Sequence, residues 1–372
     1  SETYTRDRSR LHRAAGSPAV LDGRLRFFLG RDLPKLLGPL DEVRRAGALP
    51  TGRPWRVLDV GAGLGTSTLA VAWVATTSGH RAGVEVRAVD ADAAALAFYR
   101  ALVARAEAIG CAPVTARAEV LDARAADRVI GPTGDAAMRF DLIVVGLALN
   151  ELFPPAPEGT GASKARADEA ADWLTALSSA LVPGGAIVVV EPALRPVARA
   201  LHAARDALVE RGCAPFVFAP CLGAPRCPML RNARDWCHVD VPLRLPEPLA
   251  AIARAAGLRE ERLTYSYLTL RNEPGDASSA LHRTEARAHA ARHRLVSAAL
   301  GSKGKTERFG CGTDGLVRLT RLDRHASESN APFSSLERGA LACFEGLELR
   351  GDGARVLAST RVARAGDAPD ES

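Results

Sequence analysis

Long apolar runs are missing from this chain of 372 residues. A membrane-spanning helix needs about 20 consecutive apolar residues, and no stretch of the sequence comes near that length. The first residues, Ser1 to Arg6, also lack the charged and apolar pattern of a secretion signal. We therefore expect a cytoplasmic protein without a membrane partner. A composition that is 47% hydrophobic and 25% charged predicts one large domain with an accessory module.

Lysine is scarce as well. The basic residues are almost all arginine, with lysine only at positions 35, 164, 303 and 305, and alanine is very frequent. This skew indicates a compositional bias, so the formal net charge of +6 is weak evidence for an anionic partner. Local clusters of basic residues are the better guide to nucleic-acid binding.

The sequence also lacks closely spaced cysteine pairs. The seven cysteines are odd in number and include no Cys-x-x-Cys pair. An odd count in a long chain without a secretion signal argues against a disulfide framework. The missing pair argues against a zinc ribbon.

A glycine-rich stretch, VLDVGAGLGTST at residues 57–68, organises the rest of the chain. Its short apolar run predicts a strand, its glycines a tight loop, and the residues after them a helix. A dinucleotide-binding loop would place its third glycine at Thr66, whereas here it falls at Gly65. The spacing favours S-adenosylmethionine over NAD and resembles motif I of the class I methyltransferases. The resemblance implies that the cofactor-binding residues include Asp59, near the methionine end of the cofactor, and the loop residues Gly61, Ala62, Gly63 and Gly65.

Strands and helices are predicted to alternate from Arg56 to Ala219, as a doubly wound, Rossmann-like α/β sheet requires. Residues 84–90 form a predicted strand that ends at Asp90, whose carboxylate is placed to accept hydrogen bonds from both ribose hydroxyls. A helix is expected from residue 91 to about 109, and Asp92 is an acid at its start. Asp122, after a third strand at residues 114–122, is either a ligand of the adenine amino group or a solvated turn residue.

The run FDLIVVGLAL at residues 140–149 is almost continuously apolar and predicts a strand buried on both faces. It delivers Asn150 and Glu151 to the carboxyl edge of the sheet, where open α/β sheets bind ligands. Many amino-methylating enzymes of this class have Asn/Asp-Pro-Pro-aromatic here, and this chain does not match that pattern. Asn150 and Glu151 are the catalytic candidates, with no catalytic base assigned. Further strands are expected at residues 186–192, 216–219 and 263–270, with a helix at about 195–211.

Three cysteines, Cys221, Cys227 and Cys237, fall in a loop rich in proline and glycine at residues 219–240, and Cys311 lies in a Gly-Cys-Gly segment far along the chain. Thiolates on irregular backbone suit zinc or an iron-sulfur cluster. His238 and Cys213 are the alternative fourth ligands. The isolated cysteines are expected to be ordinary apolar residues, namely Cys111, Cys213 and Cys343.

With these motifs the sequence resembles the methyltransferase-like proteins associated with the mitochondrial and bacterial small ribosomal subunit, whose animal member is methyltransferase-like protein 17. The resemblance covers about residues 56–322. It rests on the glycine motif, LNEL at 149–152, PGG at 183–185, VEP at 190–192, APC at 219–221, CP at 227–228, DWCH at 235–238 and YSYL at 265–268.

The resemblance implies a [4Fe-4S] cluster bound by Cys221, Cys227, Cys237 and Cys311, and action on the small ribosomal subunit and its rRNA. It also implies a mitochondrial location if the source is eukaryotic. The family often has Pro-His after the first cysteine, where this chain has Leu222-Gly223, so a role for that histidine does not transfer.

The predicted organisation has an N-terminal helical extension at residues 1–50, a methyltransferase domain at 51–275, a basic segment with a β-rich module at 276–362, and a disordered tail at 363–372. We expect a monomer. Residues 281–308 are rich in basic side chains that suit either phosphate contacts or a solvated helix face. These are Arg283, Arg287, Arg292, Arg294, Lys303, Lys305 and Arg308, with His282, His289 and His293.

Three functional hypotheses follow. The first is an S-adenosylmethionine-dependent methyltransferase that carries an iron-sulfur cluster and acts on the small ribosomal subunit. The second is a non-catalytic assembly or translation factor that keeps the cofactor pocket as a structural element. The third is a small-molecule methyltransferase with a structural zinc site.

Overall fold

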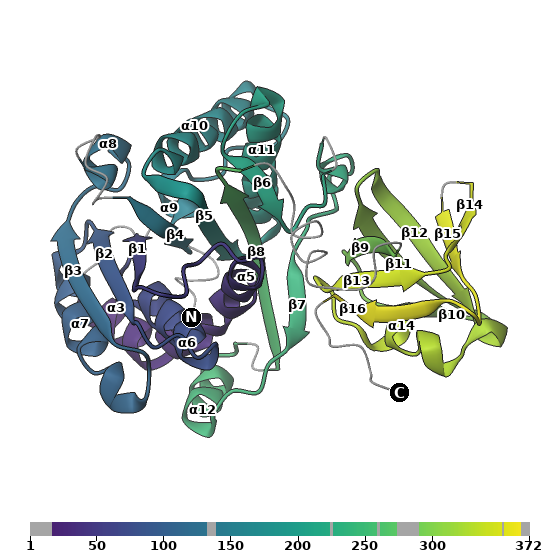
Figure 1. The fold of residues 1–372 in the computed structure, drawn as a ribbon, viewed down its shortest axis with the longest axis horizontal. Helices are drawn as coiled ribbons and strands as arrows, with labels where there is room; N and C mark the ends of the chain where they lie inside the picture. The colour runs from purple at the N-terminus through teal and green to yellow at the C-terminus, as the bar shows by residue number, and fades with distance from the viewer. Residues whose placement is uncertain are drawn as a thin grey trace.

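The computed structural model describes residues 17–131, 139–223, 226–258, 261–273, 290–351 and 353–365. Two eight-stranded sheets dominate it (Figure 1). No helix in these ranges is long and apolar enough to cross a membrane.

The first sheet has the strand order β3-β2-β1-β4-β5-β8-β6, and β7 pairs with β8 outside this path. The strands from β3 to β5 are parallel, whereas β6, β7 and β5 each run antiparallel to β8. The sheet is therefore mixed, with an antiparallel edge on a parallel centre. Its strands are β1 (Trp55–Val60), β2 (Val84–Asp90), β3 (Val114–Val120), β4 (Phe140–Gly146), β5 (Leu181–Pro192), β6 (Phe216–Ala219), β7 (Val239–Pro242) and β8 (Arg262–Arg271).

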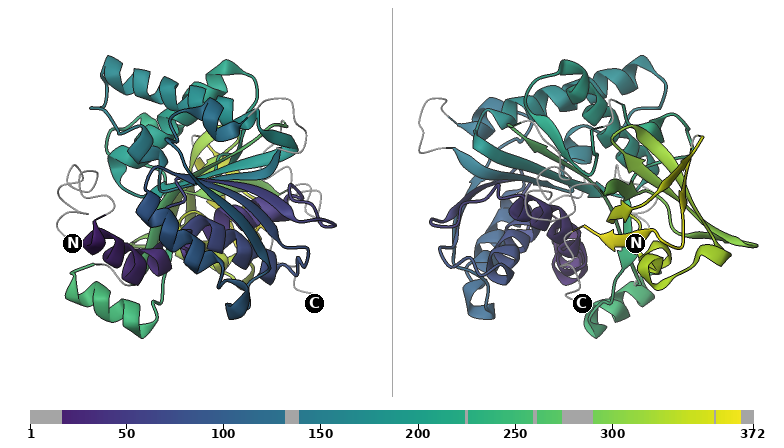
Figure 2. Two further views of the ribbon diagram at one scale, coloured as in Figure 1. Left: turned by 90° about the vertical axis from the view of Figure 1, so that its left-hand side faces the viewer. Right: turned by 45° about the vertical axis from the view of Figure 1, so that its right-hand side comes forward.

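Helices cover both faces of this sheet, as Figure 2 shows. The helices α5 (Pro34–Arg45), α6 (Thr66–Thr77) and α7 (Ala93–Val103) contribute to one apolar core, and α10 (Gly161–Ser178) and α11 (Arg195–Arg211) contribute to the other. The expected α/β class is confirmed. Strands with apolar residues on both sides can be buried only if helices cover each face of the sheet, as they do here.

Shorter helices complete this part of the chain. At the N-terminal side, α3 (Pro18–Gly23), a π-helical turn at Arg24–Phe28 and α4 (Leu29–Asp32) lead into α5. The others are α8 (Ala126–Ile130), α9 (Leu149–Leu152) and α12 (Glu247–Ala255), with a 3-10 turn at Glu107–Ile109 after α7.

The second sheet lies beside the β7–β8 edge and has the order β14-β15-β12-β11-β9-β13-β16, with β10 paired to β11 (Figure 1). Its core includes Leu295, Phe333 and Phe344, all at most 1% exposed. The strands are β9 (Ala291–Leu295), β10 (Leu300–Ser302), β11 (Lys305–Gly312), β12 (Gly315–Leu322), β13 (Leu341–Glu345), β14 (Glu348–Arg350), β15 (Gly353–Val356) and β16 (Arg361–Arg364), with α14 (Pro332–Ser335) between β12 and β13.

Buried Arg294 on β9 ties the two sheets together. Its guanidinium lies 2.7 Å from the Glu42 carboxylate on α5 and donates to the carbonyl oxygens of Pro220 and Gly339. Glu42 also accepts a hydrogen bond from the Tyr267 hydroxyl at 2.9 Å. One cation thus joins an N-terminal helix, the first sheet and the second sheet.

Both expectations for the basic residues at 281–308, phosphate contacts and a solvated helix face, are wrong for three of the arginines, which lie on β9 and β11. Arg292, Arg294 and Arg308 are 7%, 4% and 1% exposed, and Arg308 donates to the carbonyl oxygens of Phe333 and Leu336 inside the second sheet. The guanidinium groups of Arg294 and Arg308 donate hydrogen bonds to backbone carbonyl oxygens, and the five N–H donors of arginine allow one side chain to reach several of them. Of the remaining basic residues, Lys303 is exposed and Lys305 and His293 are half-buried, so phosphate contacts at these three stay a prediction. The expected contacts at Arg283, Arg287, His282 and His289 lie outside the described residues.

Candidate functional site

The glycine loop connects β1 to α6 at the carboxyl edge of the first sheet. The backbone N–H groups of Gly61 and Ala62 both donate to the carbonyl oxygen of Val89 on β2, at 2.9 and 3.1 Å. A Cβ on Gly61 would lie 2.5 Å from the Cβ of Ala148, and one on Gly65 would lie 2.9 Å from the Tyr99 ring. Both positions therefore require glycine for packing, in addition to their positive φ angles of 70° and 95°.

Gly63 differs from the other two glycines. A Cβ on Gly63 would meet no atom closer than 4.0 Å, and the nearest atoms are Asp90 Oδ2 and Gly61 O. Its missing side chain leaves open space directly beside the Asp90 carboxylate. A carboxylate beside a loop position that has no side chain can accept hydrogen bonds from ribose hydroxyls.

The Asp90 carboxylate is held by backbone N–H groups on both sides. Oδ2 accepts a hydrogen bond from Gly63 N and Oδ1 accepts one from Asp92 N, each at 2.8 Å. Asp92 caps α7 by accepting from the N–H groups of Ala94 and Ala95, so it has the helix-terminal role expected from the sequence. The ribose contact of Asp90 stays a prediction, and its carboxylate is fixed at the predicted strand end.

Asp59 lies in the centre of the sheet and is 0% exposed. Its Oδ2 accepts hydrogen bonds from the backbone N and the Oγ1 of Thr68, at 3.1 and 2.7 Å. Loss of hydration on burial raises the pKa of Asp59 to about 7. Within the described structure this carboxylate braces the start of α6 against β1, and its contact with a cofactor stays a prediction.

Asp122 follows β3 and is exposed. Its Oδ1 accepts a hydrogen bond from Arg124 N at 3.0 Å, as an aspartate does in a tight turn. This contact suits the solvated turn residue that was the alternative expectation, and an adenine contact stays a prediction.

Asn150 lies in α9, the short helical turn that follows β4, and its partner is a residue that sequence reasoning missed. The Asn150 side-chain Nδ2 and backbone N both donate to the Glu191 carboxylate at the end of β5. Glu191 is 1% exposed, and loss of hydration raises its pKa to about 8. An acid at the end of an otherwise apolar strand was the available signal. Glu151, the second candidate, is exposed.

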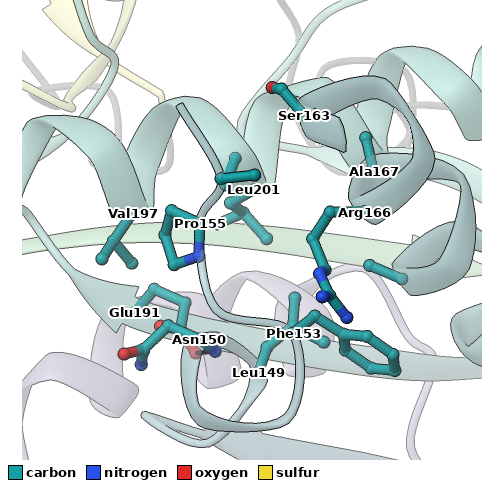
Figure 3. Close-up of a pocket in the computed structure, with 13 residues that line it drawn as sticks. Leu149, Asn150, Phe153, Pro155, Ser163, Arg166, Ala167, Glu191, Val197 and Leu201 are labelled. Carbon is teal, nitrogen blue, oxygen red and sulfur yellow. Dashed lines mark hydrogen bonds between the residues drawn. The ribbon is translucent and has the colours of Figure 1, made fainter. Parts of the chain in front are cut away.

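A cavity lies next to this pair, between the β4 end, α10 and α11 (Figure 3). Asn150 and Glu191 lie together at one end of it, and apolar side chains form much of the wall. These include Leu149, Phe153, Pro155, Val197 and Leu201.

The four predicted cysteine ligands come together between the two sheets. Cys227 and Cys311 share an apolar cluster, and Cys237 packs against it. Cys221 is 8% exposed and lies close enough to Cys227, Cys237 and Cys311 that repulsion between negative charges on the sulfurs raises the pKa of these three thiols. Burial is the larger cause, and the pKa of Cys237 and of Cys311 rises to about 12. Cys311 is thus next to the loop cysteines despite its distance in sequence.

Two arginines, buried Arg199 and half-buried Arg338, hold the irregular backbone around these cysteines. Arg199 on α11 donates to the carbonyl oxygens of Met229, Asn232 and Asp235, at 3.0, 2.9 and 2.6 Å. Arg338 donates to the carbonyl oxygens on either side of Cys237, at Trp236 and His238. The loop therefore has a defined path although it forms little regular structure.

Of the two alternative ligands, Cys213 is exposed and His238 stacks on Trp236. Within the described ranges, no group of three or more His, Cys, Asp or Glu side chains is arranged to hold a metal ion. The donor type nevertheless fits an iron-sulfur cluster, because such clusters are larger than one ion and are held by cysteine thiolates. The neighbouring Arg205 hydrogen-bonds to Cys221; burial raises the pKa of the Cys221 thiol, and the Arg205 charge partly opposes that rise.

Comparison with known proteins decides the family. The sequence model of the family described as mitochondrial small ribosomal subunit Rsm22 matches residues 39–318. The chain belongs to the Rsm22 family. The resemblance found in the sequence is confirmed, and the matched range spans the glycine loop, the Asn150 turn and all four clustered cysteines of this Rsm22 family member. No curated protein matches the chain.

Solved structures give weak similarities. Magnesium protoporphyrin IX methyltransferase from Synechocystis matches with 12% identity and a TM-score of 0.39, over 71% of this chain and 97% of its own. Precorrin-6y C5,15-methyltransferase from Geobacter metallireducens matches with 14% identity and a TM-score of 0.32, over 62% of this chain and 87% of its own. Similarities of this size do not bear on activity or substrate.

Proposed function

We propose that this Rsm22 family member binds S-adenosylmethionine at the glycine loop. The observation that carries the proposal is the open space at Gly63 beside the fixed Asp90 carboxylate. The bound cofactor would supply an activated methyl group. Gly61, Ala62, Gly63 and Gly65 would approach the cofactor through their backbone, Asp90 would hold its ribose, Asp59 would lie near its methionine end, and Asp122 would face its adenine.

The acceptor proposed for the methyl group is rRNA of the small ribosomal subunit. Support comes from the family description, which is that of a small-subunit protein. Methyl transfer depends more on in-line positioning than on acid-base catalysis, so an active site with few ionisable groups is compatible with it. Asn150 is the proposed contact with the acceptor, and Glu151 is exposed on the same turn, α9.

We also propose that Cys221, Cys227, Cys237 and Cys311 hold a [4Fe-4S] cluster. Their convergence from distant parts of the chain, the burial of Cys221, Cys227 and Cys311, and the adjacent Arg205 support it. In this position a cluster would join the cysteine loop to β11 of the second sheet. A structural zinc ion is the alternative occupant.

A non-catalytic binding factor is the second candidate function. It is favoured by one observation, that the Asn150 amide already donates to Glu191 and Leu147 inside the protein. It predicts that ribosome association survives Asp59→Ala and Asn150→Ala.

Two measurements separate these candidates. Calorimetry with S-adenosylmethionine tests cofactor binding, and incorporation of labelled methyl groups into small-subunit RNA tests transfer. If the protein binds S-adenosylmethionine and transfers the methyl group, it is the enzyme. If it binds the cofactor without transfer, it is the non-catalytic binding factor. If it does not bind S-adenosylmethionine, the cofactor site is refuted for both candidates. Iron and sulfide analysis after anaerobic purification tests the cluster, and zinc in colourless protein would refute it.

A further inference from the structure

Helix α11 presents a row of charged side chains to the cysteine loop. Asp206 and Glu210 are four residues apart, and Arg199 is seven residues before Asp206, so the three side chains share one face of the helix. Both carboxylate oxygens of Asp206 accept a hydrogen bond from Cys227 N, at 2.9 and 3.1 Å. Glu210 lies 2.7 Å from the guanidinium of Arg226, the residue before Cys227. The helix therefore fixes the backbone that carries Cys227.

Arg205, the neighbour of Asp206 on this helix, lies against the sulfurs. It is 1% exposed, its guanidinium lies 2.7 Å from the Asp206 carboxylate, and it donates a hydrogen bond to the Cys221 side chain. Burial lowers the pKa of Arg205, but Cys221, Asp206 and Cys227 together raise it by more, so the pKa lies above its ordinary value. The guanidinium is thus buried, charged and in contact with a proposed cluster ligand.

Arg294 on β9 is a second buried cation near the sulfurs. Burial raises the pKa of Cys221 and Cys311, and the charges of Arg205 and Arg294 both oppose this rise. Arg294 also pairs with Glu42 and so supports the contact between the two sheets. Arg205 pairs instead with a residue of its own helix. Its removal therefore tests the sulfur site while the Arg294 contact between the sheets stays in place.

The charges around an iron-sulfur centre control how readily it accepts an electron. Reduction adds one electron to a centre whose thiolate ligands are already negative. A cation or a hydrogen-bond donor at a ligand sulfur stabilises the reduced state and raises the reduction potential, whereas a nearby carboxylate lowers it. A buried charge acts more strongly than an exposed one, because the effective dielectric constant inside a protein is lower than that of water.

We propose that the Arg205–Asp206 pair sets the reduction potential of the cluster. Arg205 raises the potential through its charge and its hydrogen bond to the Cys221 sulfur. Asp206 lowers the potential through its own charge, while it positions Cys227 through the backbone. This inference rests on the proposed [4Fe-4S] cluster, and both residues act on the cluster from beside its ligands.

Redox titration of the full chain with dithionite and mediators tests it, with electron paramagnetic resonance detecting the reduced cluster. Arg205→Met keeps an unbranched side chain but removes the charge and the hydrogen bond. At a fixed potential, the ratio of reduced to oxidised cluster should fall at least about tenfold, which is a shift of about 59 mV for one electron. Arg205→Lys keeps the charge, so its potential should lie between those of Arg205→Met and the wild type.

Asp206→Asn should change the potential in the opposite direction. It removes a negative charge and keeps an oxygen that can accept from Cys227 N, so the same ratio should rise about threefold or more. The control is Arg211→Met on the same helix, where the arginine lies 2.7 Å from Asp172 of α10, and its potential should equal that of the wild type. Opposite shifts separate a charge effect from a loosened loop, which would move both potentials in one direction or neither.

These outcomes decide the inference. An unchanged potential in Arg205→Met, shifts of the same sign in Arg205→Met and Asp206→Asn, or a potential in Arg205→Lys no higher than in Arg205→Met would overturn it. If Arg205→Met holds no cluster, Asp206→Asn decides: a raised potential supports the inference, and an unchanged or lowered one overturns it. If neither variant holds a cluster, the pair is a structural support and the inference is wrong.

Failure of the proposed cluster is distinguishable from failure of this inference. If the wild type contains zinc or no metal, the proposed cluster is refuted and the inference fails with it. If the wild type contains the cluster and neither variant changes its potential, only the inference is refuted.

Discussion

The two candidate centres of this protein are built in different ways. The glycine loop is assembled from neighbours in sequence, since Asp59, Gly63 and Asp90 belong to consecutive strand-loop-helix units. The cysteine centre joins residues 221, 227, 237 and 311 across two sheets. A local site survives as long as its own βαβ unit is folded, whereas a dispersed site depends on the docking of both sheets. Loss of a cysteine ligand should therefore destabilise the protein more than a substitution in the glycine loop.

The largest effect is expected for Cys227→Ser. A cluster bound to ligands from both sheets is coupled to folding, so its loss should remove the visible absorbance and lower the melting temperature by about 10 °C or more. Absorbance spectra, iron analysis and thermal melts of anaerobically purified protein measure this. Exposed Cys213→Ser is the control and should behave as the wild type. A Cys227→Ser protein with a full cluster would contradict the ligand assignment.

Gly63→Val should weaken S-adenosylmethionine binding by about 100-fold or more, because the side chain fills the space beside Asp90. Calorimetry measures the Kd. The matched control is Gly47→Val, since Gly47 also has a positive φ, of 72°, and a Cβ on it would meet nothing within 4 Å. Equal affinity in the Gly63 variant and the wild type would rule out this loop as the cofactor site.

Arg199→Ala should lower the free energy of unfolding by roughly 2–3 kcal/mol, because it removes the donor shared by three carbonyl oxygens of the cysteine loop. Denaturant titration measures the change. Arg195→Ala on the same helix is the control, since Arg195 donates to one exposed carbonyl, that of Ala233, and a change below about 0.5 kcal/mol is expected. Similar losses in both variants would mean that Arg199 has no special role in the loop.

The smallest effect concerns pH. Burial raises the pKa of Glu191 from 4.5 to about 8, so the folded state holds a proton that the unfolded state releases. The resulting stability is present below about pH 4.5 and is lost as the pH rises through 8. Glu191→Gln should flatten this part of the stability profile, and exposed Glu151→Gln should leave it unchanged. An identical slope in Glu191→Gln would show that another group is responsible.

Much of the first sheet could be predicted from the sequence. The predicted strand at 84–90 and helix at 195–211 match β2 and α11, because apolar periodicity and terminal residues act within one element. Arg292, Arg294 and Arg308 were misjudged for the opposite reason. Their residue type suggests solvent or phosphate, whereas docking of β9 and β11 buried all three and placed Arg294 and Arg308 against backbone carbonyl oxygens.

The sequence by itself determined the α/β alternation, the glycine loop and the strand ends that carry Asp90 and Asn150, since each of these follows from residues within about one element of each other. Only the tertiary structure decided that Glu191 faces Asn150, that Arg199 holds the cysteine loop and that Cys311 reaches the other thiols. These contacts join residues on different elements. Their existence depends on how whole layers pack, which local patterns of hydrophobicity and charge do not specify.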